Sequence, residues 1–286
     1  MTPVLRQSLE NRLQEALGAA ARIASVRGST LVLADGQRFF LKTQHAPPTD
    51  VFEREAEGLG ALEGIGRVRG PSIVLPGASG DTRFLILEEI SRGASHPSAW
   101  ESFGRRLAEH HRASRGERFG FDHDNYLGRT PQPNGWSADG AEFFRRHRLA
   151  FQLDLARRNG HADDALNRLG DSLLARLDSL LDLAGEPPCL LHGDLWSGNV
   201  LSDEEGEVRW IDPAAHYAHR EADLAMAKLF GGFPETFFAA YGESWPLPPG
   251  QRERKDLFQL YHLLNHLNLF GGGYREQCLE VMRRLT

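Results

Sequence analysis

The chain has 286 residues, of which 41% are apolar and 25% are charged, and its formal net charge is −6. Such a chain is long enough for one large globular domain or two coupled lobes. The negative charge argues against nucleic-acid binding, and no stretch approaches the roughly 20 apolar residues of a membrane span. The N-terminal segment is amphipathic and charged, unlike a signal peptide. We therefore expect a cytoplasmic protein with no nucleic-acid or membrane partner. The sequence leaves the oligomeric state open, and a monomer is the favoured state.

The first 90 residues have the pattern of a small antiparallel sheet with a helix packed on it. An amphipathic helix ends near Gly18, and Asp35-Gly36 is a strong hairpin signal between two short apolar segments. Glycine and proline separate the later segments. The expected elements are strands at 22–26, 29–34 and 37–42, a helix at 50–63, and strands at 72–75 and 83–88.

Helical periodicity dominates from Pro97 onward. An apolar strand at 189–191 and a hairpin of strands 200–202 and 207–211 interrupt it, and segment 116–139 has no periodic pattern. The expected helices are 97–113, 141–158, 162–183, 220–230, 252–269 and 274–285. The chain is therefore expected to have an α+β fold with two lobes, residues 1–90 and 91–286, and a cleft between them.

Three oxygen-bearing side chains are expected to converge beside the hairpin of the second lobe. An antiparallel pair of strands brings together the residues that precede and follow it, so Asn199 and Asp212 meet. Asp194 lies just upstream, in a loop where two glycines permit a tight backbone. Carboxylate and amide oxygens are suitable ligands for Mg²⁺.

The order of these residues is similar to the signature of protein kinases. His-Gly-Asp is followed by Asn five residues after the Asp, and by a second Asp beyond a hairpin. In that template the first Asp accepts the proton of the substrate hydroxyl, and the Asn and second Asp hold the metals. Asp194 is thus the candidate base, and Asn199 and Asp212 are the candidate metal ligands. Each piece alone is a common cap or turn, but the joint order favours the kinase interpretation.

The first lobe provides an independent check, because a kinase needs a strand lysine held by a carboxylate of the next helix. Lys42 ends such a strand and is one of only three lysines in the chain. Glu55 is the favoured partner, and Glu53 is the alternative. The turn at Gly28 is where a loop covering the nucleotide phosphates would lie.

The strand that ends the first lobe runs into a hinge. Glu88 and Ile90 lie at its end, where backbone groups would meet an adenine edge, and a plain buried strand is the alternative. The 1–90 lobe is therefore expected to bind the nucleotide, and the 91–286 lobe is expected to carry catalysis and substrate binding.

Five runs of residues carry a resemblance to one particular family. They are 190–199 with HGDLWSGN, 212–214, 220–226 with READLAM, 230–233 and 261–271. Together they resemble the fructosamine kinases, also called ketosamine-3-kinases, in the aminoglycoside-phosphotransferase branch of kinase-like folds. The resemblance spans nearly the whole chain, and Trp196 and the READLAM run are its most selective features.

The resemblance implies that the γ-phosphate of ATP is transferred, with Mg²⁺, to the C3 hydroxyl of a ketoamine. Fructosamine, ribulosamine and erythrulosamine adducts, small or protein-bound, all remain open as substrates. Phosphorylation there destabilises the adduct and promotes deglycation. The expected substrate contacts are Trp196, whose alternative role is to anchor the loop in the core, and His216 and Tyr217, beside an Ala218 that is often glycine in relatives.

Three other interpretations fit the sequence less well. An aminoglycoside or choline kinase would share the same machinery but not Trp196 and READLAM. A nucleotide-binding pseudokinase would not need Lys42 together with the three residues of the second lobe. His262 and His266 have the spacing of a zinc protease, but the Glu after the first His is missing, which favours core packing.

Overall fold

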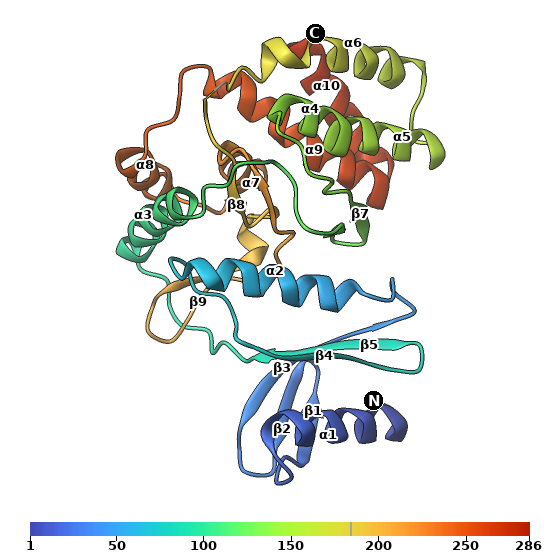
Figure 1. Ribbon diagram of the computed structural model, residues 1–286, viewed down its shortest axis with the longest axis vertical. Coiled ribbons are helices and arrows are strands. Elements are labelled where there is room, and N and C mark those ends of the chain that lie inside the picture. The colour runs from blue at the N-terminus through green and yellow to red at the C-terminus, as the bar shows by residue number, and fades with distance from the viewer. Residues whose placement is uncertain (184) are drawn as a thin grey trace.

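A five-stranded antiparallel sheet forms the N-terminal part of the computed structural model, which describes residues 1–183 and 185–286 (Figure 1). The strand order is β1-β2-β3-β5-β4. Two helices accompany the sheet, α1 (Pro3–Leu17) and α2 (Val51–Ile65). The strands are β1 (Ile23–Arg27), β2 (Thr30–Leu33), β3 (Arg38–His45), β4 (Ile73–Ser79) and β5 (Thr82–Glu88).

The two helices cover opposite faces of this sheet, which explains the unbroken apolar run in β5. Successive side chains of a strand point to opposite faces. Phe84 and Ile86 therefore pack in the cluster that contains Leu9 of α1, whereas Leu85 and Leu87 pack in the cluster of α2. Figure 1 shows α2 on the side of the sheet that faces the rest of the molecule.

Helices dominate the remainder of the chain. The largest core cluster joins side chains of the last helices, α9 and α10, to those of α5 and α6, and a second core is rich in aromatic residues of α3 and α8. The helices are α3 (Pro97–Ala113), α4 (Gly140–Phe144), α5 (Phe151–Arg158), α6 (Asp164–Leu180), α7 (Glu221–Leu229), α8 (Glu235–Ser244), α9 (Gln251–Phe270) and α10 (Arg275–Leu285).

Three small antiparallel pairs lie among these helices. β6 (Asn125–Leu127) pairs with β7 (Thr130–Gln132), β9 (Val200–Ser202) pairs with β10 (Val208–Trp210), and β8 (Cys189–Leu191) pairs with β11 (His216–Ala218).

Every helix and strand expected from the sequence is present: α3, β8 and β9 have the expected bounds, and the others have shifted ends. The expected helix 141–158 contains a π-helical turn, η1 (Arg145–Ala150), between α4 and α5. Four strands and α-helices of the described residues were not predicted: β6 and β7 in the segment without periodicity, β11, and α8. Among the described residues, none of the helices combines the length and the apolar character that a bilayer span requires.

Candidate active site

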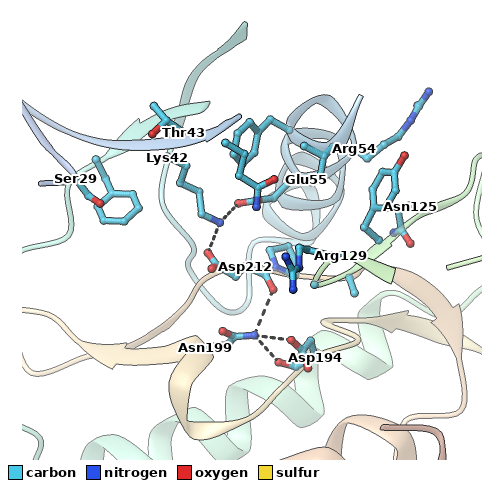
Figure 2. Close-up of a pocket in the computed structure, with 18 of the residues that line it drawn as sticks. Ser29, Lys42, Thr43, Arg54, Glu55, Asn125, Arg129, Asp194, Asn199 and Asp212 are labelled. Atoms are coloured by element: carbon cyan, nitrogen blue, oxygen red, sulfur yellow. Dashed lines mark hydrogen bonds and ion pairs between the residues drawn. The ribbon is translucent and has the colours of Figure 1, made fainter. Parts of the chain in front are cut away.

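Lys42 is held between two carboxylates that come from different parts of the chain. Because Leu41 points into the α1 face of the sheet, Lys42 points to the opposite face, toward α2. Its Nζ lies 2.7 Å from Oε1 of Glu55 and 2.8 Å from Oδ1 of Asp212 (Figure 2). Burial alone would lower the pKa of Lys42, but these two negative charges outweigh it and raise the pKa, so the lysine is charged. Of the two candidate glutamates, the structure brings Glu55 to the lysine.

The β9–β10 hairpin brings Asn199 and Asp212 together, as the sequence predicts. The amide of Ile211 donates to the carbonyl of Asn199 at 2.9 Å and closes the hairpin base. Nδ2 of Asn199 donates to the carbonyl and to Oδ2 of Asp194, both at 2.9 Å (Figure 2). Asp212 has φ 56°, a left-handed conformation that is uncommon outside glycine and occurs preferentially at functional sites.

Asp194 has the electrostatics of a general base. Burial raises its pKa to about 7, the hydrogen bond from Asn199 opposes this shift, and the charges of Asp212 and Asp223 add to it. A base with a pKa near neutrality combines a useful ionised fraction with a strong affinity for the proton.

Asp223, which the sequence interpretation did not single out, positions the loop that carries Asp194. It lies on α7 with 1% of its surface exposed. Its two carboxylate oxygens accept the amides of His192 and Gly193, both at 2.9 Å. Burial would raise the pKa of Asp223, but these bonds and His111 lower it to about 2. The sequence did contain a signal for Asp223, because this aspartate interrupts the apolar run 222–227 of the expected helix 220–230.

Position 193 requires a glycine, because two backbone segments approach each other too closely there to leave room for a side chain. The φ of Gly193 is 82°, and a Cβ there would lie 2.1 Å from the carbonyl oxygen of Ala214. The loop that carries Asp194 and the segment after Asp212 therefore touch at this glycine.

A cavity of about 510 Å³ collects these residues between the sheet and the helical part. It is lined from three directions: by Gly28, Ser29, Lys42 and Glu55 of the sheet and α2; by Asp194, Trp196, Asn199 and Asp212; and by Asn125, Tyr126, Gly128 and Arg129 of the β6–β7 hairpin. Gly28 lies in the β1–β2 turn with φ 58°.

An adjoining cavity of about 440 Å³ lies at the hinge and shares Phe40 and Asp212 with the first. Glu88 and Ile90 both line it. The amide of Glu88 donates to Ser72, and its carboxylate binds Arg209 at 3.0 and 3.1 Å, so these groups are used within the protein. Ile90 differs, because neither its amide nor its carbonyl has a backbone partner among the described residues.

The three expected substrate contacts have different environments. Trp196 lines the main cavity with 36% of its surface exposed and meets Phe230 edge-to-face at 6.1 Å between ring centres. His216 is 4% exposed and hydrogen-bonds to the carbonyl of Ala214, and Tyr217 packs against Trp136. The structure does not bring His216 and Tyr217 into the cavity, because β11 pairs with β8 inside the helical part.

The donor set fits a magnesium ion shared with phosphates. Oδ1 of Asn199 accepts no hydrogen bond from the described residues, and the carboxylate of Asp212 is 42% exposed. Mg²⁺ is usually bound by one or two protein oxygens together with substrate phosphates and water. No group of three or more His, Cys, Asp or Glu in the described part of the chain forms a metal cage, and His262 and His266 are joined instead by a hydrogen bond along α9.

The fold belongs to the kinase-like class. A solved aminoglycoside phosphotransferase has this fold, with a TM-score of 0.61 at 13% identity over 97% of this chain and 98% of its own, which shows the fold alone. The chain belongs to the fructosamine kinase family, because the family model described as fructosamine kinase matches residues 3–286. The fold class and the family resemblance expected from the sequence are thus confirmed.

Relatives with assigned activities cover almost the whole chain. A "probable ketoamine kinase" of Synechocystis is 38% identical over 293 residues, 99% of this chain and 97% of the relative. A chloroplastic protein-ribulosamine 3-kinase of Arabidopsis thaliana is 40% identical over 271 residues, 91% of this chain and 81% of the relative. A solved Thermobifida fusca protein, named a "putative fructosamine-3-kinase", is 36% identical with a TM-score of 0.83, over 97% of this chain and 98% of its own.

Proposed function

We propose that this protein is an ATP- and Mg²⁺-dependent kinase that phosphorylates the C3 hydroxyl of ketoamines and thereby promotes deglycation. The observation that carries the proposal is the meeting of Lys42–Glu55, Asp194, Asn199 and Asp212 around one cavity. Membership of the fructosamine kinase family supports the ketoamine as acceptor, and the names of two relatives, which specify a 3-kinase, support the C3 position.

Residues 1–90 act in this proposal as the nucleotide-binding lobe. The hinge cavity receives the adenine, with the free backbone groups of Ile90 as its partners. Lys42, oriented by Glu55, binds the phosphates, and the turn at Gly28 covers them. The bound Mg²⁺ supplies positive charge that neutralises the phosphates, and Asn199 and Asp212 are the residues that hold it.

Residues 91–286 carry the chemistry and the acceptor. Asp194 accepts the proton of the C3 hydroxyl while the hydroxyl oxygen bonds to the γ-phosphorus, the bond from that phosphorus to the bridging oxygen breaks, and ADP leaves. Trp196 packs against the sugar chain or the alkyl stem of the amine. The acceptor is small or protein-bound, and the reaction takes place in the cytoplasm, where ATP is available.

An acceptor panel tests this function. ADP release is measured with MgATP and ribulose-, fructose- and erythrulose-lysine, and in parallel with kanamycin and choline. We expect turnover with at least one ketoamine and none above the ATPase background with the other two. Turnover restricted to kanamycin or choline would replace the proposal, and binding of ATP without any turnover would favour a pseudokinase.

A further inference from the structure

Arg129 lies at the tip of the β6–β7 hairpin and lines the main cavity. Leu127 pairs with Thr130, so Gly128, with φ 63°, and Arg129 form the two-residue turn. The Arg129 side chain is exposed, and Figure 2 shows it drawn among the cavity-lining residues, in the same view as Asp194 and Asp212.

The charge of Arg129 is uncompensated, unlike that of the other cations that line this cavity. Lys42 is paired with Glu55 and Asp212, and Arg54 is paired with Asp50 at 2.9 Å and with Glu57 at 2.7 Å. Within the part of the chain that the structure describes, the Arg129 guanidinium has neither a hydrogen bond nor a carboxylate within 4.0 Å. Its five N–H donors are therefore available to a ligand.

Buried hydrogen bonds attach this hairpin to the segment that follows Asp212. Nδ2 of Asn125 donates to the carbonyl of Ala215 at 2.8 Å, and Nε2 of Gln132 donates to the carbonyl of Ala214 at 3.1 Å. Gln132 also accepts from the hydroxyl of Tyr261 at 2.8 Å. Both Asn125 and Gln132 are buried, so the base of the turn is fixed relative to Asp212.

The hairpin also reaches the N-terminal lobe. The hydroxyl of Tyr126 donates to Oδ1 of Asp50 at 2.7 Å, just before the first residue of α2. Tyr126 packs on the apolar cluster of α2 as well. Arg129 is thus carried by an element that contacts both walls of the cavity.

We propose that Arg129 is the binding residue for an oxyanion that occupies the cavity during the reaction, an inference that rests on the proposed function. A guanidinium matches the paired oxygens of a phosphoryl or carboxylate group, and a firmly attached hairpin loses little freedom on binding one. Two groups of this chemistry are available: the transferred phosphoryl group, and the α-carboxylate of a ketoamine formed on an amino acid.

Kinetics with two matched acceptors test this assignment. Arg129→Gln and Arg129→Lys are compared with wild type on ribulosylated Nα-acetyl-lysine, which has a free carboxylate, and on its amide. Arg158→Gln is the control, because Arg158 is an exposed arginine at the end of α5. We expect Arg129→Gln to lose roughly 10- to 100-fold in kcat/KM, as for other charge-assisted hydrogen bonds, and Arg129→Lys to recover part of the loss.

The pattern of the loss identifies the oxyanion. A fall in kcat with both acceptors assigns the phosphoryl group, whereas a rise in KM with the acid alone assigns the carboxylate. Arg129→Gln values within twofold of wild type on both acceptors would overturn the proposal. Wild-type turnover of the amide tests the proposed function separately. If no ketoamine is turned over, calorimetric titration with MgADP and aluminium fluoride, which mimics the transferred phosphoryl group, still compares Arg129→Gln with wild type. Equal affinities in that titration would reject the phosphoryl group as the ligand of Arg129.

Discussion

At the scale of single residues, the structure decides between Glu55, which the sequence favours as the partner of Lys42, and Glu53, which the sequence leaves open as the alternative. Glu53 and Glu55 lie on the same helix, but a 3.6-residue repeat separates their directions by about 200°. Glu55 points to Lys42, with 14% of its side chain exposed. The hairpin that joins Asn199 to Asp212 was predictable, because a short antiparallel pair fixes the distance between its flanking residues. The sequence favoured Glu55 but could not exclude Glu53, because the rotation of α2 about its axis depends on packing against the sheet.

Glu55→Gln is expected to lower kcat/KM for ATP by roughly 10-fold or more, because a neutral amide holds the lysine less firmly than a carboxylate does. Glu53→Gln is the matched control on the same helix and should change this value by less than twofold. Initial rates at varied ATP concentration measure both. A larger effect at Glu53 than at Glu55 would contradict the site geometry.

Asp194 makes the stability of the metal-free protein depend on pH. Because its pKa rises from an ordinary value of 3.8 to about 7, the folded state binds more protons than the unfolded state between these two values. Folding therefore loses stability as the pH rises through this window, and the full loss is present above pH 7. Asp194→Asn removes the charge, so it should be more stable than wild type at pH 8 and gain less at pH 5. Urea unfolding without Mg²⁺ measures the difference, and a gain independent of pH would argue against a buried charge.

At the scale of elements, the loop that carries Asp194 depends on α7. Asp223 lies on α7 among apolar residues, and its carboxylate accepts hydrogen bonds from two backbone amides of the loop. Periodicity predicts this helix, but the contact with the loop joins residues 31 and 30 positions apart and depends on tertiary packing. The β6–β7 hairpin could not be predicted for a similar reason. Its strands are only three residues long, and its buried polar side chains donate to backbone carbonyls that are far away in the sequence.

Asp223→Asn should destabilise the protein by about 1.5–3 kcal/mol, because one buried amide loses its charged acceptor. The activity should fall as well, because the loop that carries Asp194 is no longer fixed. Asp154→Asn, at a side chain that is 61% exposed on α5, is the control and should stay within about 0.5 kcal/mol of wild type. Urea unfolding of both variants is the measurement, and equal values would show that Asp223 does not hold the loop.

At the scale of the whole molecule, two adjoining cavities lie along the boundary between the sheet and the helical part. Asp212 lines both, and it also contacts Lys42 across that boundary. Patterns of strands and helices were sufficient to predict two parts of different character. They could not predict that His216 would be buried in β11. That strand pairs with β8, and the paired residues His216 and Leu191 are 25 positions apart in the sequence.

The most direct test of phosphorylation at the C3 hydroxyl is to locate the transferred phosphate by NMR. Ribulose-lysine is incubated with MgATP and the wild-type protein, and the product is followed by phosphorus and proton spectra. We predict a phosphomonoester coupled to the proton on C3, with formation slowed by roughly 10²–10⁴-fold in Asp194→Asn although ATP binding is retained. A phosphate on another carbon, or formation at a near-normal rate in Asp194→Asn, would contradict the account.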